Sequence, residues 1–439
     1  MSATFAVRGG RPLVGTVRVP GDKSISHRAL MLAAVARGTS HLRGLSEGDD
    51  VHRTGRALAA LGAGLEAGPA WSTEVSVEGV AELRSPGVPI DVGNSGTTMR
   101  LLAGLVAPYP IDVTLTGDDS LRSRPMDRVA VPLRAMGAVV EGREERCLPP
   151  LHLRGGPLRG IDYTPPMASA QVKSCVLLAG LGASGPTVVR EATPTRLHTE
   201  ELLTLAGAAL EEHTDADGTH VVTVQASTLD PLDLDVPGDP SQAAFWVVAA
   251  TVVPGSDVTV EHCYAGPARR GFLDVLTRMG ASVEETPVAG AGALSVQRHL
   301  RVRSAALRAT EVHAAEITGL DEVPALAVAA ALAEGTTAFR AVGELRVKES
   351  DRFTGVVELV RSFGGSARAE GDDLLVDGTG ALRAGVLDAR GDHRMAMAGA
   401  VAALAAPGES TIRGWEAVAT SYPGFGDDLV HLGGEGALT

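Results

Sequence analysis

Apolar residues gather in six stretches that are spread along the whole chain. Each stretch is rich in alanine and hydrophobic on every side, which is typical of a helix that is packed on all faces. The six predicted buried helices lie near residues 26–37, 97–107, 169–181, 241–252, 323–334 and 393–406. A helix without a polar face needs cover from all directions, so these segments should form the interior of the fold.

A second pattern lies between these stretches, where an amphipathic segment ends in an apolar residue, a glycine and small residues. Glycine directly after a helix takes the left-handed backbone conformation at little cost, so each occurrence predicts a helix end. The six glycines, spaced 69 to 84 residues apart, are Gly62, Gly137, Gly207, Gly280, Gly364 and Gly433. Segments with two-residue alternation, such as "DVTVEH", predict the strands between the helices.

Together the two patterns predict six copies of one α/β unit. Each copy has two helices and several strands in about 73 residues, which is 439 residues divided by six. A chain of this length suits two or three domains, so we expect three units in each half. An open solenoid is the alternative, but a closed arrangement of three units covers the buried helices better.

Composition narrows the class of protein. The chain is 44% hydrophobic and 21% charged, as in ordinary folded proteins. It shows no signal peptide and no apolar run long enough to span a membrane, so we expect a cytoplasmic protein without a membrane partner. Three scattered cysteines without a CxxC motif argue against structural zinc. The net charge of −14 argues against nucleic-acid binding.

Cations stand at the starts of the predicted buried helices. Only three of the 39 basic residues are lysines, and they are Lys23, Lys173 and Lys348. Ser, Asp and Asn in these starts are expected as helix caps. Capping does not explain a cation beside the positive end of a helix, as at Lys23 and Arg394, unless an anion binds between them. Several such ends would build an anion site.

Three further segments carry candidate chemistry. "RVKESDR" places Lys348 and Arg352 one turn apart if it is helical, although a solvated charge ladder would look the same. "DEVP" offers Asp321 as a base before a buried helix. "DDSLRSRPMDR" reads as an arginine-rich loop. The chain has no nucleotide-binding, hydrolase or zinc-protease motif, which leaves an anionic substrate handled without metal.

Seven segments in the same order resemble the signature sequences of the 5-enolpyruvylshikimate-3-phosphate synthase family of enolpyruvyl transferases. They are "PGDKSISHRAL", "GNSGTTMRLL", "SRPM", "SAQVKS", "LDEVPALAVAAA", "LRVKESDR" and "DHRMAM". The resemblance implies two domains, each of three βαβαββ units in an inside-out α/β barrel. It places one domain at 21–238 and the other at 1–20 plus 239–439, with the active site in the cleft between them.

The implied reaction is transfer of the carboxyvinyl group of phosphoenolpyruvate to the 5-hydroxyl of shikimate 3-phosphate, in the shikimate pathway to chorismate and aromatic amino acids. No cofactor or metal is implied, the family favours a monomer, and glyphosate is a candidate inhibitor. Two phosphomonoesters and two carboxylates would bring roughly −5 to −6 into the site. The cations predicted from the sequence match this charge.

The resemblance also implies the roles of single residues. Asp321, Glu349, Lys348 and Lys23 are the expected catalytic residues. The residues expected to bind shikimate 3-phosphate are Lys23, Ser24, Arg28, Ser169, Ala170, Gln171, Arg196, Asp321 and Lys348. Those expected to bind phosphoenolpyruvate are Lys23, Gly96, Arg124, Gln171, Arg352 and Arg394. The family gives Lys173 no role.

Three positions depart from the common family pattern, and the mildest is Thr195, where serine is common. Ala170 replaces a serine, so only its backbone can bind, and Thr420 replaces a lysine near the C-terminus, which removes one expected phosphoenolpyruvate contact.

Two alternatives remain. One is the sister transferase that acts on UDP-N-acetylglucosamine, but it carries Lys-Asn where this chain has Lys23-Ser24, and a loop cysteine where this chain has Asp119. The other is an inactive six-repeat scaffold that only binds an anion.

Overall fold

The computed structural model of the protein describes residues 3–65, 73–289, 294, 296–317 and 319–438. The chain divides into two compact units, which we call unit 1 (Met1–Pro20 and Pro237–Thr439) and unit 2 (Gly21–Val236). Both boundaries fall within the two Val-Pro-Gly-Asp steps of the sequence.

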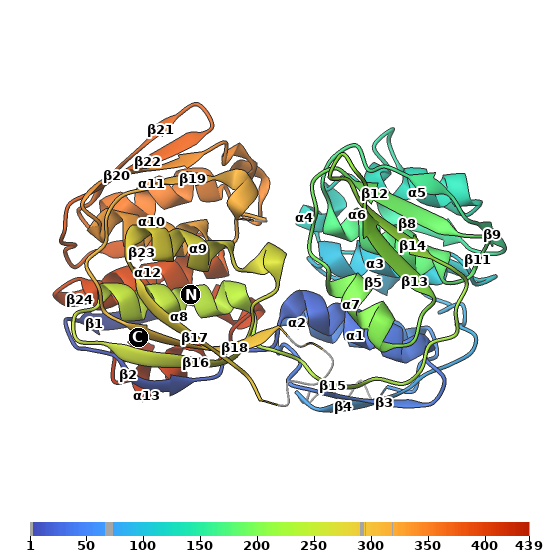
Figure 1. Cartoon of the computed structure of the whole chain (residues 1–439), viewed down its shortest axis with the longest axis horizontal. Coiled ribbons are helices and arrows are strands. Elements are labelled where there is room, and N and C mark those ends of the chain that lie inside the picture. Colours follow the sequence, from blue (N-terminus) through green and yellow to red (C-terminus); the bar gives the residue numbers. More distant parts are fainter. Residues whose placement is uncertain (1–2, 66–72, 290–293, 295, 318, 439) are drawn as a thin grey trace. The chain divides into compact units, whose positions relative to one another are not determined.

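Each unit contains three buried helices, as predicted from the apolar stretches (Figure 1). In unit 2 they are α1 (Lys23–Val35), α3 (Gly96–Val106) and α6 (Ala170–Gly180). In unit 1 they are α8 (Pro240–Val252), α10 (Val323–Leu332) and α12 (His393–Ala405). The three helices of unit 1 contact one another pairwise and form the centre of its apolar core.

Side-chain caps begin five of these six helices. Asp22, Ser95, Ser169, Asp239 and Asp392 each accept a hydrogen bond from a backbone N–H of the first turn. Such caps satisfy donors that the helix itself leaves unpaired. The sixth helix, α10, has no side-chain cap but carries a proline in its first turn, where the missing N–H costs nothing.

The amphipathic helices lie outside the buried ones. They are α2 (Asp49–Ala60), α5 (Asp127–Met136), α7 (His198–Leu205), α9 (Gly271–Met279), α11 (Arg352–Ser362) and α13 (Phe425–His431). All six glycines predicted to end them have positive φ, from +73° at Gly207 to +114° at Gly137. This confirms the second sequence pattern.

Four-stranded sheets with one repeated order cover the helices. In each, a short strand runs parallel to its neighbour, and the next two strands are antiparallel. Unit 2 has two such sheets. The strands of the first are, in order, β5 (Ile90–Asp91), β6 (Asp112–Thr116), β8 (Leu148–Arg154) and β7 (Val139–Arg143). Those of the second are β10 (Asp162–Tyr163), β12 (Thr187–Glu191), β14 (His220–Val224) and β13 (Leu210–Thr214). In unit 1 one such sheet is β19 (Glu311–His313), β20 (Gly335–Arg340), β22 (Asp373–Gly378) and β21 (Ser366–Glu370).

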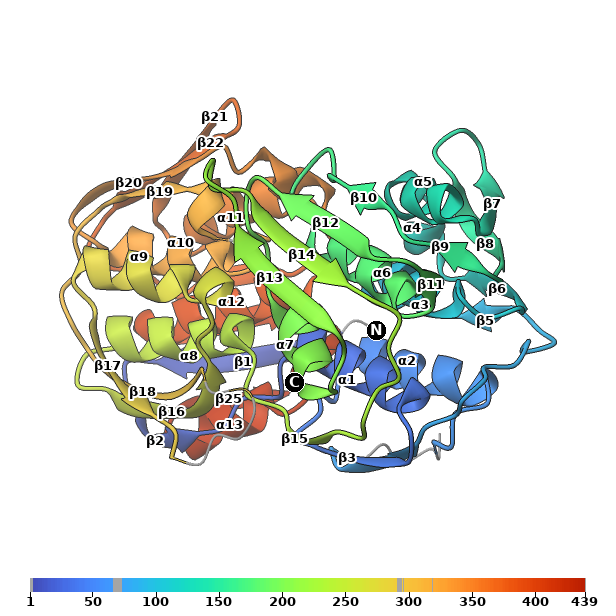
Figure 2. The same ribbon diagram turned by 45° about the vertical axis from the view of Figure 1, so that its right-hand side comes forward.

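The remaining sheets use both ends of the chain. Two of them are in unit 1. One contains, in order, β23 (Val386–Asp388), β24 (Gly408–Arg413), β1 (Thr4–Gly9) and β25 (Glu435–Leu438). The other contains β17 (Ser282–Pro287), β18 (Gln297–Arg303), β16 (Asp257–Tyr264) and β2 (Val14–Val17). In unit 2, β15 (Asp233–Asp235), β3 (Thr39–Arg43) and β4 (Val75–Glu78) form a sheet of three described strands. Two further strands of two residues each, β9 (Leu158–Arg159) and β11 (Ala183–Ser184), form a separate parallel pair. Figure 2 shows β12, β14 and β13 in front of α6 and α7, which they contact.

The repeat is therefore βαβαββ, as in β5, α3, β6, α5, β7 and β8, and the predicted fold class is confirmed. Within each unit the three buried helices lie inside and the sheets lie outside. This closed arrangement excludes an open solenoid. Two of the six βαβαββ repeats, those that contain α1 and α8, exchange their leading strands. β2 precedes α1 but pairs with β16, which follows α8, while β15 precedes α8 but pairs with β3, which follows α1.

The condition attached to one local prediction is not met, and a second local prediction was wrong. Lys348 does not share a helix with Arg352, because a 3₁₀ turn, η3 (Gly343–Val347), ends before it and the Asp351 cap starts α11 at Arg352. The arginine-rich segment before Pro125 is not all loop either, since Asp118 caps the short helix α4 (Asp119–Arg122). Within the described part of the chain, no helix combines the length and apolar character that a membrane crossing requires.

Candidate active site

The first turn of α1 in unit 2 presents Lys23 and Ser24. The Lys23 Nζ lies 3.1 Å from an Asp50 carboxylate oxygen of α2, and both side chains are partly exposed. The Ser24 hydroxyl accepts a hydrogen bond of 3.1 Å from the Arg196 guanidinium. Three of the predicted residues therefore meet at the start of one buried helix.

Arg28 lies one turn further along α1 and is buried. Its Nε donates to the Thr199 hydroxyl at 2.7 Å, its Nη2 to the Ser174 hydroxyl at 2.7 Å and its Nη1 to the Ser24 carbonyl at 2.9 Å. Burial, followed by the nearby charge of Arg196, lowers the pKa of Arg28 to about 10. Arg28 remains a cation at neutral pH, with three of its five N–H donors already used.

A second group joins the starts of α3 and α6. Gln171 accepts from Arg100 Nη1 at 2.7 Å and donates to the Thr97 hydroxyl at 3.0 Å. Burial, followed by the charge of Arg124, lowers the pKa of Arg100 to about 10. Gly96 faces both arginines, because a Cβ added there would lie 2.9 Å from Arg100 Nη1 and 3.5 Å from Arg124 Nη1.

Arg124 follows α4 and is held by polar neighbours. Its Nη2 donates to Asn94 Oδ1 at 2.8 Å and to the Ser120 hydroxyl at 3.2 Å. Ser169 caps α6 and Ala170 is its first residue, so both lie at the same helix start as Gln171. These positions gather donors and cations on one side of unit 2.

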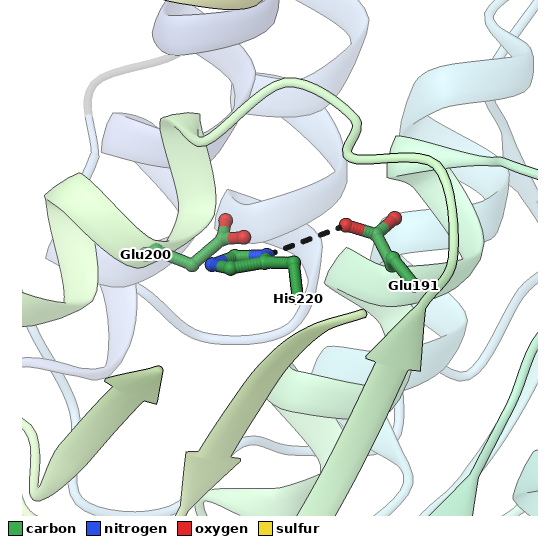
Figure 3. A group of neighbouring side chains, drawn as sticks. All are labelled: Glu191, Glu200 and His220. Atoms are coloured by element: carbon green, nitrogen blue, oxygen red, sulfur yellow. Dashed lines mark ion pairs between the residues drawn. The ribbon is translucent and has the colours of Figure 1, made fainter. Parts of the chain in front are cut away.

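Lys173 differs from the other two lysines, because it is fully buried in α6. Its Nζ pairs with Glu191 at 2.7 Å and with Glu200 at 2.6 Å. Glu191, Glu200 and His220 also form a group whose ligand atoms lie close enough together to hold a metal ion (Figure 3). The ammonium of Lys173 already provides a cation to both carboxylates, so this cluster fits an internal ion pair.

The corresponding region of unit 1 centres on Arg352, which has no exposed surface. Its Nε and Nη2 donate to the two oxygens of Asp392 at 2.8 and 3.3 Å, and its Nη1 lies 3.1 Å from Asp321. Glu349 contacts the same guanidinium at 2.7 Å. Although burial opposes the charged form of both partners, the pairing raises the pKa of Arg352 and lowers that of Asp392 to about 2.

Arg394 and Lys348 complete this region. Arg394 begins α12, and its Nη2 lies 3.4 Å from an Asp321 oxygen. Asp321 is therefore paired with the two arginines, Arg352 and Arg394, that the family resemblance assigns to phosphoenolpyruvate. Lys348 Nζ pairs with Glu344 at 2.6 Å rather than with a residue of the Asp321 group.

The structure thus brings the predicted residues together in two sets. The set in unit 2 contains Lys23, Ser24, Arg28, Gly96, Arg124, Ser169, Ala170, Gln171 and Arg196. The set in unit 1 contains Asp321, Glu349, Arg352 and Arg394, and Lys348 lies in the same unit but pairs with Glu344. Thr420, where the family's lysine is missing, ends the 3₁₀ turn η4 (Trp415–Thr420) and is half-buried.

Sequence reasoning missed a buried cluster in unit 1 that adjoins Asp321. Arg269 Nη2 donates to the cap residue Asp239 at 2.6 Å, and its Nη1 lies 3.5 Å from Glu322. The Ser241 hydroxyl donates to the same Glu322 carboxylate. One sequence signal could have indicated this cluster: a Gly-Asp step precedes both α8 and α12, and the aspartate of each step, Asp239 and Asp392, pairs with an arginine. The arginine itself comes from a distant part of the chain and has no local motif.

Comparison with known proteins identifies the family. Residues 7–429 match the family described as EPSP synthase (3-phosphoshikimate 1-carboxyvinyltransferase). A 3-phosphoshikimate 1-carboxyvinyltransferase of Acidithiobacillus ferrooxidans is 45% identical over 422 residues, which are 96% of each chain. The enzyme of the same name from Pelotomaculum thermopropionicum is 46% identical over 431 residues, covering 96% of this chain and 97% of the relative.

Solved structures agree with this match. The EPSP synthase of Acinetobacter baumannii superposes with a TM-score of 0.89 at 37% identity and covers 100% of both chains. The enolpyruvyl transferase NikO of Streptomyces tendae shares the fold with a TM-score of 0.77 at 20% identity, covering 100% of this chain and 99% of its own. With βαβαββ repeats, cationic helix starts and a family match over nearly its whole length, the chain belongs to the EPSP synthase (3-phosphoshikimate 1-carboxyvinyltransferase) family.

Proposed function

We propose that the chain carries out the reaction of its family with the residues gathered in the two sets. The reaction transfers the carboxyvinyl group of phosphoenolpyruvate to the 5-hydroxyl of shikimate 3-phosphate and releases phosphate. It proceeds by protonation at C3, addition of the hydroxyl at C2, and loss of phosphate and a proton from the tetrahedral adduct. Both substrates are multiply charged anions, which suits the cations of both sets.

In unit 2 the proposed binding partners of shikimate 3-phosphate are grouped around α1 and α6. Ser24 and Arg196 are hydrogen-bonded to each other, and Arg28 lies one turn below them. Ser169, Gln171 and the backbone of Ala170 line the start of α6. An arginine beside hydroxyl groups suits a phosphomonoester on a polyol ring.

Phosphoenolpyruvate is assigned to Arg124, Arg352 and Arg394, with Gly96 and Gln171 beside them and Lys23 shared by both substrates. Gly96 supports this role, because a side chain there would crowd the guanidinium groups of Arg100 and Arg124 at the start of α3. A planar guanidinium binds carboxylate and phosphate oxygens in pairs, which a lysine does not.

Asp321 is the proposed base that accepts the proton of the 5-hydroxyl, with Lys348 as its partner on the hydroxyl side and Glu349 near the C3 proton. The observation that carries this assignment is the pairing of Asp321 with Arg352 at 3.1 Å and with Arg394 at 3.4 Å. These arginines hold the carboxylate beside the proposed phosphoenolpyruvate site, where a base would have to act.

Release of inorganic phosphate from phosphoenolpyruvate tests the proposal. Phosphate should appear only when shikimate 3-phosphate is present. Release with UDP-N-acetylglucosamine in its place would favour the sister transferase, and no release with either acceptor would favour an inactive scaffold.

We also propose that glyphosate inhibits the enzyme by competing with phosphoenolpyruvate. Gly96 leaves the room that such an inhibitor needs, and a Cβ at this position would come within 2.9 Å of Arg100 Nη1. Inhibition should be competitive with phosphoenolpyruvate and weaker in Gly96→Ala. Noncompetitive inhibition would contradict the shared site.

The enzyme is further proposed to work in the cytoplasm as a monomer without a bound metal or cofactor. Its three cysteines are free and buried, which suits a reducing compartment. Sedimentation at micromolar concentration should give the mass of one chain, 45.0 kDa.

A further inference from the structure

The buried lysine of α6 joins the two ends of the segment that carries Arg196. Lys173 has no exposed side-chain surface and pairs with Glu191 at 2.7 Å and Glu200 at 2.6 Å. Glu191 ends β12, and Glu200 lies in the first turn of α7. Between them, residues 192–197 form the connection that includes Arg196.

This connection is also held from within. Thr195, the residue before Arg196, donates its hydroxyl to Glu191 Oε1 at 2.6 Å and its backbone N–H to Glu191 Oε2 at 3.4 Å. Figure 3 shows Glu191 and Glu200 on opposite sides of His220, each coming from its own end of the connection. The Lys173 ammonium thus holds both ends of the connection, at Glu191 and Glu200. Through Glu191 it also holds Thr195 within the connection.

The charge balance makes the lysine necessary for this arrangement. Glu191 and Glu200 are almost completely buried, and burial raises the pKa of Glu200 although Lys173 opposes the shift. Removing one partner of a buried ion pair leaves the other charge without compensation, which is strongly unfavourable. Without the ammonium, the two carboxylates would lose the shared contact that fixes both ends of the connection.

The other faces of α6 tie the same helix to the rest of the proposed site. Gln171 is hydrogen-bonded to Arg100, and the Ser174 hydroxyl bonds both Arg28 and Thr199. Lys173 provides the remaining connection, from α6 to the segment that carries Arg196.

We propose that Lys173 is a positioning residue for the binding of shikimate 3-phosphate, because it holds the Arg196 segment in register with Ser169 and Gln171 of α6. The inference rests on the proposed function of these three residues. Lys173 itself, being fully buried, does not touch the substrate.

Lys173→Met tests the inference, since methionine fills a similar volume without the charge. The KM for shikimate 3-phosphate should rise by about tenfold or more, because small displacements of a binding group are costly. The KM for phosphoenolpyruvate and the kcat at saturation should change much less. Leu202→Ala is the matched control, because it removes buried apolar volume from α7 without touching either carboxylate.

A purely structural role predicts another result. Lys173→Met and Leu202→Ala would then raise the KM for shikimate 3-phosphate equally at an equal loss of Tm, and this outcome would overturn the inference. An unchanged KM in folded Lys173→Met would overturn it as well.

Thr195→Val decides the question if Lys173→Met does not fold. This change cuts the hydroxyl bond to Glu191 but leaves the buried charges paired. A raised KM for shikimate 3-phosphate alone supports the inference, and a normal KM overturns it. The unsubstituted enzyme is assayed first, so that its failure to release phosphate counts against the proposed function and not against Lys173.

Discussion

Individual basic side chains of the candidate site are paired with carboxylates of the protein itself. Lys23 pairs with Asp50, Lys348 with Glu344, and Arg352 with Asp392. The sequence argument required an external anion to explain cations at helix starts, but these carboxylates also offset the charge. The cations alone therefore indicate preorganised side chains, and the family match supplies the identity of the anions.

Asp321 allows a direct test at this scale. Asp321→Asn removes the proposed base but keeps its shape, so kcat should fall by about 10²- to 10⁴-fold. Steady-state phosphate release should show KM values close to those of the unsubstituted enzyme. A raised KM with normal kcat would show that Asp321 binds substrate and does not act as a base.

Because of Asp392, the free energy of unfolding should depend on pH in the acid range. Its pKa is lowered from 3.8 to about 2 in the folded protein, because Arg352 outweighs the effect of burial. The resulting stabilisation, about 2 kcal/mol, is present above the pKa of an unfolded aspartate and disappears as the pH falls through about 2.

Thermal unfolding of Asp392→Asn measures this effect, and asparagine can still cap α12. At pH 7 the variant should melt several degrees below the unsubstituted protein, and the difference should shrink between pH 4 and pH 2. Asp119→Asn, at a fully exposed carboxylate, should change Tm little at either pH. A difference that stays constant with pH would contradict the predicted ion pair.

At the scale of elements, the sequence predicted what local physics determines. The six buried helices and the six glycine-ended helices follow from apolar periodicity and from one backbone conformation, and all twelve were found. Pairing between distant segments has no such local signal. The Arg269–Asp239–Glu322 cluster and the two carboxylates of Lys173 were missed because the partners lie on different elements, well beyond the reach of a local motif.

The start of α11 shows a different kind of failure. A helical reading of "RVKESDR" satisfied charge spacing, but Asp351 accepts a hydrogen bond from the Thr354 backbone and begins the helix later. In the candidate site, the family resemblance led to residues that the structure groups within each unit, such as Ser24 with Arg196. The resemblance gave no information on the hydrogen bonds and ion pairs that hold these residues in place.

The glycine ends of the outer helices predict a stability effect. Gly137 has φ +114°, and a Cβ there would meet no atom closer than 3.5 Å, so Gly137→Ala introduces backbone strain without a clash. We expect a loss of about 1–2 kcal/mol, measured by urea unfolding.

Gly424→Ala is the control, because Gly424 has φ −81° and open space around its Cβ position. It should leave the free energy of unfolding nearly unchanged. Equal effects of the two substitutions would show that left-handed backbone at Gly137 is not the cause.

For the whole molecule, the proposed function gives unit 2 residues for both substrates, and Arg196 and Arg394 test the division between shikimate 3-phosphate and phosphoenolpyruvate. Arg196→Ala in unit 2 should raise the KM for shikimate 3-phosphate by about tenfold to a hundredfold, because it removes a charge-assisted hydrogen bond. Arg394→Ala in unit 1 should raise the KM for phosphoenolpyruvate by a similar factor. Each variant serves as the control for the other, and a shift in the same substrate's KM for both would contradict the division.

The exchanged leading strands have a consequence for how the chain is made. Unit 2 is one continuous segment, and its last strand, β15, emerges from the ribosome with the rest of it. β1 and β2 are synthesised before their partners β24 and β16, which lie about 400 and 240 residues later. The edges of β1 and β2 must therefore stay unpaired while all of unit 2 is made, and β1 must wait longer still for β24.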